Sequence, residues 1–205
     1  MIAATDRSMT QETALFRVMT LNANGIRAAA RKGMFDWVPR QRADVVCLQE
    51  IKCETDAFPY LEIEELGYNV EAHGQKSYNG VALLSRFAMD DVIKGLPGND
   101  EDGQARYIEA LILSDNPVRV GGLYLPNGNP APGPKFDYKL AWMDRLLARA
   151  KDLLAQEIPF VMAGDYNIIP QAEDAAKPDS WRDDALFRLE SRTAFRRLLN
   201  LGLTE

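Results

Sequence analysis

Short apolar runs recur along the sequence, and most of them are rich in Val, Ile, Leu or Tyr. Runs of this length, set between polar segments, are typical of β-strands rather than of helices. The predicted strands are residues 16–21, 44–48, 80–84, 107–113, 118–125 and 159–163.

Several segments between the predicted strands have apolar residues spaced as in an α-helix. The clearest case is residues 135–156, where apolar positions recur three and four residues apart and predict one buried stripe. That stripe consists of Phe136, Leu140, Met143, Leu147, Ala150 and Leu154. Shorter helices are predicted at residues 34–42, 56–66 and 180–199, the last with Ala185, Leu189, Phe195 and Leu198 or Leu199 facing inward. Strands and helices mixed in this way indicate an α/β layered domain.

The length of 205 residues fits one large domain better than two small ones. Two loops rich in Pro and Gly, at residues 126–134 and 170–179, show no change of composition beyond them, so we interpret them as loops within one domain. Residues 1–15 are polar, mixed in charge and without the apolar core of a signal peptide. We therefore expect a disordered leader at 1–15 and a single domain at 16–205.

Composition and charge exclude several classes of protein and of metal site. A net charge of -6 and a pI of about 5.0 argue against a protein held on phosphates by bulk charge, yet they allow a phosphate-binding enzyme with acidic metal ligands and a narrow basic rim. Cys47 and Cys53 predict two free thiols in a reducing cytoplasm. A single histidine, His73, argues against a zinc site. No apolar run approaches the roughly 18 residues of a membrane span, so we expect a cytoplasmic protein that does not enter a membrane.

Polar residues able to bind a metal or a phosphate follow four of the predicted strands. Strand ends in layered α/β folds are where a rigid scaffold presents side chains to a ligand. We therefore expect these side chains to converge on one oxygen-lined site. They are Asn22, Glu50, Tyr124, Asp165 and Asn167.

Magnesium suits such a site, since it prefers oxygen ligands and is often held by one or two carboxylates with several waters. Glu50 is the candidate main ligand, and Asn22 offers a carbonyl oxygen. Asp165 and Asn167 are two residues apart and can point the same way, one to position a water and the other to donate to a phosphate. Tyr124 can donate to the phosphate or to developing charge. Any one of these residues alone is better explained as a turn former or a solvated strand end, so spacing does not name a reaction.

Ordered motifs along the chain carry a resemblance to a known family. They are residues 20–27 (TLNANGIR), 48–52 (LQEIK), 73–76 (HGQK), 80–85 (GVALLS), 122–128 (GLYLPNG) and 164–168 (GDYNI). Together and in this order they resemble the exonuclease III family, the abasic-site (AP) endonuclease type of the endonuclease/exonuclease/phosphatase superfamily. The segments GLYLPNG and HGQK favour the DNA-repair branch over other members.

The resemblance implies a four-layered sandwich of two packed mixed β-sheets flanked by helices. It implies that Glu50 is the principal metal ligand, with Asn22, Asp165 and Asn167 also in the metal site. It further implies that Tyr124, Asp165 and Asn167 act on the scissile phosphate. The implied cofactor is Mg²⁺, with Mn²⁺ as a substitute.

The implied substrate is DNA. The family's activities are 3′-5′ exonuclease action, cleavage at abasic sites and 3′ phosphatase action. Candidates for a basic rim that contacts the DNA backbone are Arg27, Lys52, Lys76 and Arg106, although each is equally well explained as ordinary surface charge.

The family pattern continues beyond the point that corresponds to Glu205, with a final Asp-His pair that faces the phosphate. We therefore expect the sequence to lack the C-terminal part of the fold, which would leave an apolar face and a strand edge open to water. The leading hypothesis is a monomeric DNA-repair hydrolase. The alternatives are an inactive nucleic-acid-binding remnant and a related phosphodiesterase acting on lipid headgroups or inositol phosphates. The lack of a basic amphipathic helix disfavours the last of these.

Overall fold

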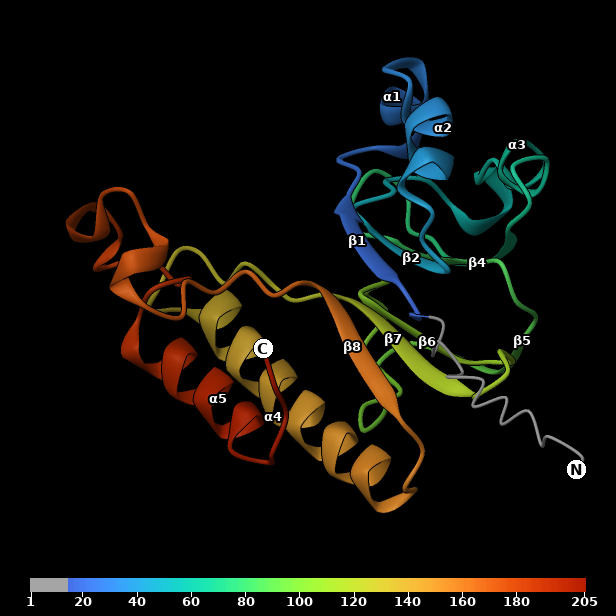
Figure 1. The fold of residues 1–205 in the computed structure, drawn as a ribbon. Helices are drawn as coiled ribbons and strands as arrows, with labels where there is room; N and C mark the ends of the chain where they lie inside the picture. Colours follow the sequence, from blue (N-terminus) through green and yellow to red (C-terminus); the bar gives the residue numbers. More distant parts are fainter. Residues whose placement is uncertain (1–14) are drawn as a thin grey trace, which may run out of the picture.

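The computed structural model describes residues 15–205 and contains two four-stranded β-sheets (Figure 1). Sheet A has the order β1-β2-β4-β3 and comprises β1 (Val18–Asn22), β2 (Val45–Gln49), β4 (Val81–Ser85) and β3 (Asn69–His73). Sheet B has the order β5-β6-β7-β8 and comprises β5 (Met89–Lys94), β6 (Tyr107–Ile112), β7 (Val118–Tyr124) and β8 (Phe160–Asp165). The pairs β1–β2 and β7–β8 are parallel and the other pairs antiparallel, so both sheets are mixed.

Apolar side chains from both sheets fill the space between them. Fully buried residues in this layer are Val45, Cys47, Val81 and Leu83 of sheet A and Ile108, Ala110, Ile112 and Val120 of sheet B. Gly122 in β7 lets the sheets approach closely, because a Cβ there would lie 3.1 Å from Leu83 Cδ2. Every residue of β2 and β4 is buried, as is typical of strands covered on both faces.

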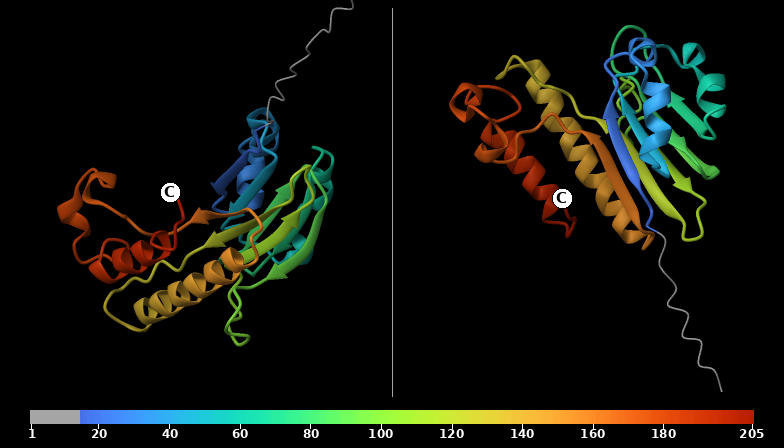
Figure 2. Two further views of the ribbon diagram at one scale, coloured as in Figure 1. Left: turned by 60° about the horizontal axis from the view of Figure 1, so that its bottom comes forward. Right: turned by 45° about the horizontal axis from the view of Figure 1, so that its top comes forward.

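Helices cover the outer face of each sheet and complete four layers (Figures 1 and 2). Sheet A is covered by α1 (Ile26–Arg31), α2 (Met34–Trp37) and α3 (Tyr60–Glu64). Sheet B is covered by α4 (Pro134–Ala155), against which α5 (Leu189–Leu199) packs. The predicted four-layered α/β sandwich is confirmed.

The predicted strands are all present, and their ends lie within two residues of the expected positions. The sequence pattern missed β3 and β5, whose residues are NVEAH and MDDVIK. Both mix charged with apolar residues, and the pairing of β5 shifts register between Asp90 and Ile93. Neither strand therefore shows the continuous apolar run that revealed the others.

The helix predicted at residues 180–199 is wrong in its first half, because α5 begins only at Leu189. Preceding it are a 3₁₀ helix, Pro178–Trp181, and a series of turns. The Asp184 carboxylate accepts the backbone N–H of Leu186 at 2.8 Å. Backbone groups in this segment are thus satisfied by side chains, which removes the need for a helix.

Prolines divide the two longer helices predicted on sheet A. Pro39 lies in a 3₁₀ helix, Val38–Gln41, which follows α2 directly. Pro59 separates another 3₁₀ helix, Thr55–Ala57, from α3. The prediction that Leu154 and Leu189 face inward is also wrong, because Leu154 is 40% exposed and Leu189 is 72% exposed. Each stands near the end of its helix, Leu154 in α4 and Leu189 in α5.

The structure also bears on the expectations about the cysteines, membrane spans and the N-terminal leader. Cys47 and Cys53 are free thiols, as predicted, and both are buried. Within residues 15–205, no helix combines the length and apolar content needed to cross a bilayer. The leader predicted at residues 1–15 lies, except for Leu15, outside the described residues.

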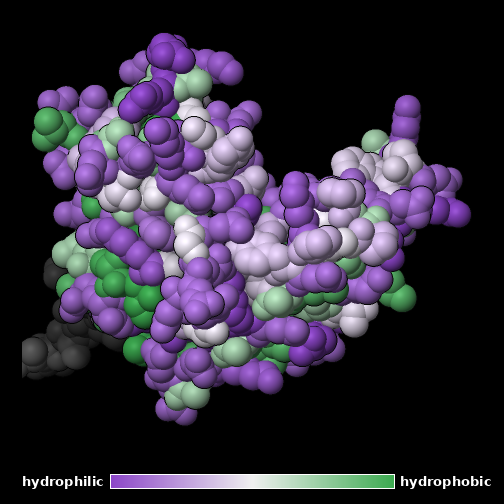
Figure 3. All heavy atoms as spheres, turned by 180° about the vertical axis from the view of Figure 1, so that it is seen from behind, coloured by the Kyte–Doolittle hydropathy of each residue, from purple (hydrophilic) through white to green (hydrophobic). Residues whose placement is uncertain are grey.

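From behind, the outline is hollowed between the part that carries α1–α3 and the loops that precede α5 (Figure 3).

Candidate functional site

Strand ends from both sheets meet at one edge of the molecule. β1 ends at Asn22, β8 ends at Asp165, and Glu50 follows β2 directly. The Nδ2 group of Asn22 donates to Glu50 Oε1 at 2.8 Å and to Asp165 Oδ2 at 3.0 Å. One amide therefore joins two carboxylates that are far apart in the sequence and belong to different sheets.

Glu50 has a left-handed backbone conformation, with φ of 51°, which few non-glycine residues adopt. Its carbonyl accepts the N–H of Gly25 at 2.7 Å, and its Oε2 atom pairs with Lys52 Nζ at 2.8 Å. Burial opposes ionisation, but hydrogen bonds from Asn22 and Lys52 outweigh it and lower the pKa of Glu50 below its ordinary value. The carboxylate is therefore charged at neutral pH.

Tyr124 closes β7 and lies beside Glu50. Burial raises the pKa of the Tyr124 hydroxyl to about 12, with a further contribution from the Glu50 carboxylate, so the phenol remains a donor at neutral pH. The Arg106 guanidinium lies 4.9 Å from the centroid of the Tyr124 ring and donates to the Tyr124 carbonyl at 3.2 Å. Arg106 therefore holds Tyr124 in place as well as adding positive charge.

Asp165 and Asn167 form a tight turn at the end of β8. The backbone N–H of Asn167 donates to Asp165 Oδ1 at 3.0 Å, and the Asn167 side chain donates to the Leu125 carbonyl at 2.9 Å. Gly164 precedes this turn, and a Cβ there would lie 1.9 Å from the Leu123 carbonyl oxygen. Only glycine therefore allows β7 and β8 to run this close and carry Tyr124 and Asp165 side by side.

The donor set of this site suits Mg²⁺. Within residues 15–205, no three or more His, Cys, Asp or Glu side chains are grouped so that they could hold a metal by themselves. A metal at this site would therefore have two carboxylates as its acidic ligands. Glu50 and Asp165 offer two carboxylates around one amide, and Mg²⁺ is commonly held by one or two carboxylates while keeping several waters. The Asn22 Oδ1 atom accepts the N–H of Asn24 at 3.0 Å, and its NH₂ group faces the carboxylates. A ligand role for Asn22 would need this amide to turn over, and together with that of Asn167 it stays a prediction.

The residues predicted for the basic rim divide into two pairs. Lys52 Nζ contacts Glu50 and also donates to Asn24 Oδ1 at 2.5 Å. Arg106 lies over Tyr124, as described above. Arg27 in α1 and Lys76 in the loop after β3 are exposed on the surrounding surface. The structure thus brings Lys52 and Arg106 to the centre of the site, and the predicted DNA contacts of the rim remain predictions.

Three further residues belong in this region and were not singled out by the sequence pattern. The Nδ2 group of Asn127 lies 3.5 Å from Asn167 Oδ1. Lys139 is buried beneath both asparagines, and this burial lowers the pKa of its ammonium to about 8. Tyr78 is an aromatic side chain that is 70% exposed beside Lys76. The available signal was Lys139 itself, because its position in α4 follows the spacing of the apolar stripe.

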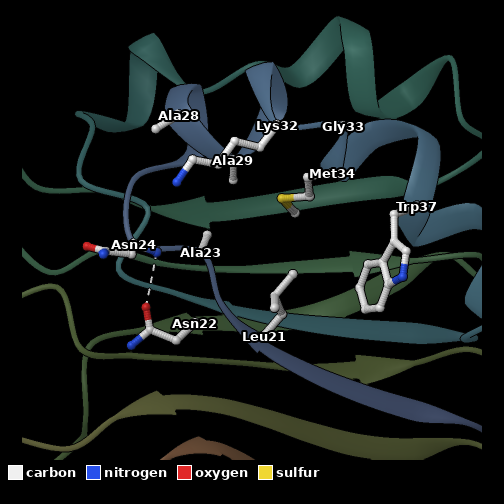
Figure 4. A pocket seen from close by; sticks show the side chains of 10 residues that line it. All are labelled: Leu21, Asn22, Ala23, Asn24, Ala28, Ala29, Lys32, Gly33, Met34 and Trp37. Carbon is white, nitrogen blue, oxygen red and sulfur yellow. Dashed lines mark hydrogen bonds between the residues drawn. The ribbon is translucent and has the colours of Figure 1, made fainter.

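A cavity of about 430 Å³ opens beside Asn22 (Figure 4). Leu21, Met34 and Trp37 form its apolar end, and Asn22 and Asn24 form its polar end. Trp37 is 46% exposed, so the apolar end is open to solvent. The carboxylate site is therefore bordered on the β1 side by apolar surface.

Comparison with known proteins places this fold in one class. The Endonuclease/Exonuclease/phosphatase family matches residues 19–204. An exodeoxyribonuclease III from Haemophilus influenzae is 32% identical over 201 residues, which cover 92% of this chain and 73% of the relative. An AP endonuclease from Archaeoglobus fulgidus superposes with a TM-score of 0.85 at 30% identity, covering 93% of this chain and 72% of the other. The 3′ phosphatase NExo from Neisseria, bound to a product DNA hairpin, superposes with a TM-score of 0.86 at 32% identity, covering 93% and 72%.

The chain therefore belongs to the endonuclease/exonuclease/phosphatase superfamily and, within it, to the exonuclease III family. By family it is an exodeoxyribonuclease III-like hydrolase. It spans 73% of the length of the Haemophilus influenzae relative.

Proposed function

We propose that this protein is a magnesium-dependent DNA phosphodiesterase of the exonuclease III type, a 3′-5′ exonuclease and abasic-site endonuclease of DNA repair. The observation that carries the proposal is the Asn22 amide that joins Glu50 and Asp165 at strand ends of both sheets. The names of the relatives, which include an exodeoxyribonuclease III and an AP endonuclease, support DNA as the substrate. So does the product DNA hairpin bound by the Neisseria phosphatase.

Phosphodiester hydrolysis needs neutralised charge, a positioned water and donors to the phosphate oxygens. Magnesium held by Glu50 and Asp165 supplies the neutralising charge when it is bound. Asp165 is fixed through both carboxylate oxygens, by the Asn22 amide and the Asn167 N–H, and in this position it orients a water and accepts its proton. Tyr124, protonated at neutral pH, donates a hydrogen bond to the phosphate.

The DNA backbone would rest on the basic rim of Arg27, Lys52, Lys76 and Arg106, with the protein acting as a monomer. Contacts of this kind position the duplex without reading its sequence, and they weaken as salt rises. Mn²⁺ satisfies the same oxygen donors as Mg²⁺. The two buried, unpaired cysteines are consistent with work in a reducing cytoplasm.

The test is a duplex oligonucleotide with one abasic site, incubated with Mg²⁺, Mn²⁺ or EDTA. We expect nicking with either metal and none in EDTA. Asp165→Asn should lower the rate on the order of 10³-fold, because the variant loses its proton acceptor and one anionic ligand. Asp152→Asn is the matched control, since Asp152 is an exposed carboxylate on α4, and it should keep the wild-type rate.

Three outcomes would contradict the proposal. Nicking that persists in EDTA would remove the metal from the mechanism. Salt-sensitive DNA binding without turnover would identify an inactive binding remnant. Hydrolysis of inositol phosphates or lipid headgroups in place of DNA would identify a different phosphodiesterase of the superfamily.

A further inference from the structure

Lys139 is a fully buried lysine in the middle of the apolar face of α4. Lysine is almost never fully buried unless its ammonium is paired. Here the ammonium donates to backbone carbonyls of Asn127 at 3.1 Å, Asn167 at 2.6 Å and Ala185 at 3.3 Å. An ammonium has three N–H donors, so these carbonyls use all of its hydrogen-bonding capacity.

The three carbonyls belong to three separate segments. Asn127 is in the loop after β7, Asn167 is in the loop after β8, and Ala185 is in the turns before α5. Among the described residues, the ion pairs do not include Lys139. The lysine therefore serves as a tie between backbones rather than as the partner of an acid.

Two of the tied residues carry amide side chains at the candidate site. Asn127 and Asn167 face each other, with 3.5 Å between Nδ2 and Oδ1. The backbone N–H of Asn167 also holds Asp165 Oδ1 at 3.0 Å. A shift of the Asn167 backbone would therefore move both an amide and the carboxylate beside it.

The loop after β7 lies directly on the lysine stem. Gly128 has φ of 90°, and a Cβ there would lie 2.7 Å from Lys139 Cδ and 3.1 Å from Ala185 Cβ. There is no space for a side chain between this loop and α4. The height of Asn127 above the helix is thus set by contact with Lys139.

A second connection joins the outer parts of the same segments. The Asn129 side chain donates to both oxygens of Asp184 at 3.1 Å and accepts the N–H of Ala185 at 3.0 Å. This connection links the β7 loop to the turns before α5. Lys139 differs from it because it contacts the backbone of Asn127 and Asn167 themselves.

We propose that Lys139 is a positioning residue, which fixes the backbones of Asn127 and Asn167 so that their amides meet the phosphate of the substrate. The inference rests on the proposed phosphodiesterase function and adds a residue that does not touch the substrate. A displacement of about 1 Å in groups that position a substrate can cost about 10²-fold in rate. Lys139 therefore acts on kcat through the two asparagines.

The experiment compares Lys139→Met with Lys151→Met, which alters an exposed lysine of the same helix. The first readout is the ¹H–¹⁵N spectrum of the asparagine side chains, recorded well below the melting temperature and without DNA. We expect the Asn127 and Asn167 side-chain resonances to shift in Lys139→Met and to stay unchanged in Lys151→Met.

The second readout is kcat and KM for abasic-site nicking. We expect kcat of Lys139→Met to fall between about tenfold and 10²-fold with a smaller change in KM, and Lys139→Arg, which keeps a cation, to recover part of the loss. A lysine with a purely structural role would lower the melting temperature while leaving kcat and the asparagine resonances at wild-type values. That result would overturn the inference.

Failure of the proposed function is distinguishable from failure of this inference. A wild-type protein that does not nick DNA contradicts the function, whereas the spectra still report whether Lys139 positions the asparagines. If Lys139→Met does not fold, Gly128→Ala decides, because its Cβ pushes the Asn127 loop off the lysine while the ammonium stays. Unchanged resonances of Asn127 and an unchanged kcat in that variant would overturn the inference.

Discussion

Two groups of acidic side chains in this molecule differ in how their charge is compensated. Glu109 in β6 is fully buried and accepts hydrogen bonds from Arg119 at 2.9 Å and from Arg149 at 3.0 Å. Glu50 and Asp165 lie at strand ends that are partly exposed, and the donor they share is a neutral amide. The closest cation there is Lys52, paired with Glu50 alone and itself partly exposed.

The difference separates a carboxylate that is neutralised inside the protein from the carboxylates that we propose to bind the metal. Two guanidinium groups compensate one carboxylate at Glu109, so its negative charge is fully used inside the protein. At the strand ends Glu50 forms an ion pair with Lys52, while the Arg106 guanidinium lies over the Tyr124 ring. Carboxylates that make no arginine ion pair among the described residues keep negative charge available to an external cation.

The largest effect should follow from breaking the buried group. Glu109→Gln leaves Arg149 without its counter-ion and leaves the buried Arg119 with only the exposed Asp91 as a partner, and we expect the free energy of unfolding to fall by about 3–5 kcal/mol. Urea unfolding followed by circular dichroism measures the change. Glu50→Gln is the control and should change stability by about 1 kcal/mol or less. Equal losses of unfolding free energy in the two variants would contradict the distinction between Glu109 and the strand-end carboxylates.

Metal affinity should respond in the opposite order. Glu50→Gln removes the carboxylate that we propose as the main metal ligand, and we expect Mn²⁺ binding, followed by electron paramagnetic resonance, to weaken by about 10- to 100-fold. Glu109→Gln, studied at a temperature where it is folded, should bind Mn²⁺ as the wild type does. Wild-type affinity in Glu50→Gln would show that the ion is held elsewhere.

A smaller effect is expected for the phenol beside Glu50. Tyr124→Phe keeps the ring under Arg106 but removes the donor, and a hydrogen bond to a charged group is worth enough to slow nicking by about tenfold. The rate is measured with saturating Mg²⁺ and abasic duplex. Stability should be nearly unchanged, and a rate equal to wild type would remove Tyr124 from the chemistry.

The smallest effect concerns the single ammonium partner. Lys52→Met removes a partly exposed ion pair, and Mn²⁺ should bind about two- to fivefold more tightly at neutral pH because the competing cation is gone. The folded pKa of Glu50 lies below its ordinary value, so metal binding is present above that pKa and is lost as the pH falls through it. Without Lys52 the pKa rises, and the midpoint of that loss should move to higher pH. A midpoint that moves lower would contradict the assignment.

The fold could be predicted from sequence where the pattern of apolar residues alone determines the element. Fully buried strands such as β2 and β4 appear as continuous apolar runs, and α4 appears as a stripe. The edge strands β3 and β5 could not be found, because their residues alternate neither cleanly nor continuously. The turns before α5 depend on hydrogen bonds to Asn129 and within the segment at Asp184, which no local pattern reveals.

The sequence predicted which side chains lie together at the strand ends, and it did not predict their geometry. Asn22, Glu50 and Asp165 were found because each follows an apolar strand. That the Asn22 NH₂ group would join the two carboxylates depends on how two sheets pack, which spacing does not encode. Lys139 follows the spacing of the apolar stripe, but that spacing does not reveal which backbone carbonyls its ammonium contacts.

Gly164 has a consequence for the interpretation of sequence variants. A change at this position leaves every polar residue of the site intact, so a survey restricted to catalytic side chains would score it as harmless. Because any Cβ there collides with the Leu123 backbone, even alanine would force apart the strands that carry Tyr124 and Asp165. In a natural population, Gly164 should therefore be as intolerant of substitution as the carboxylates themselves.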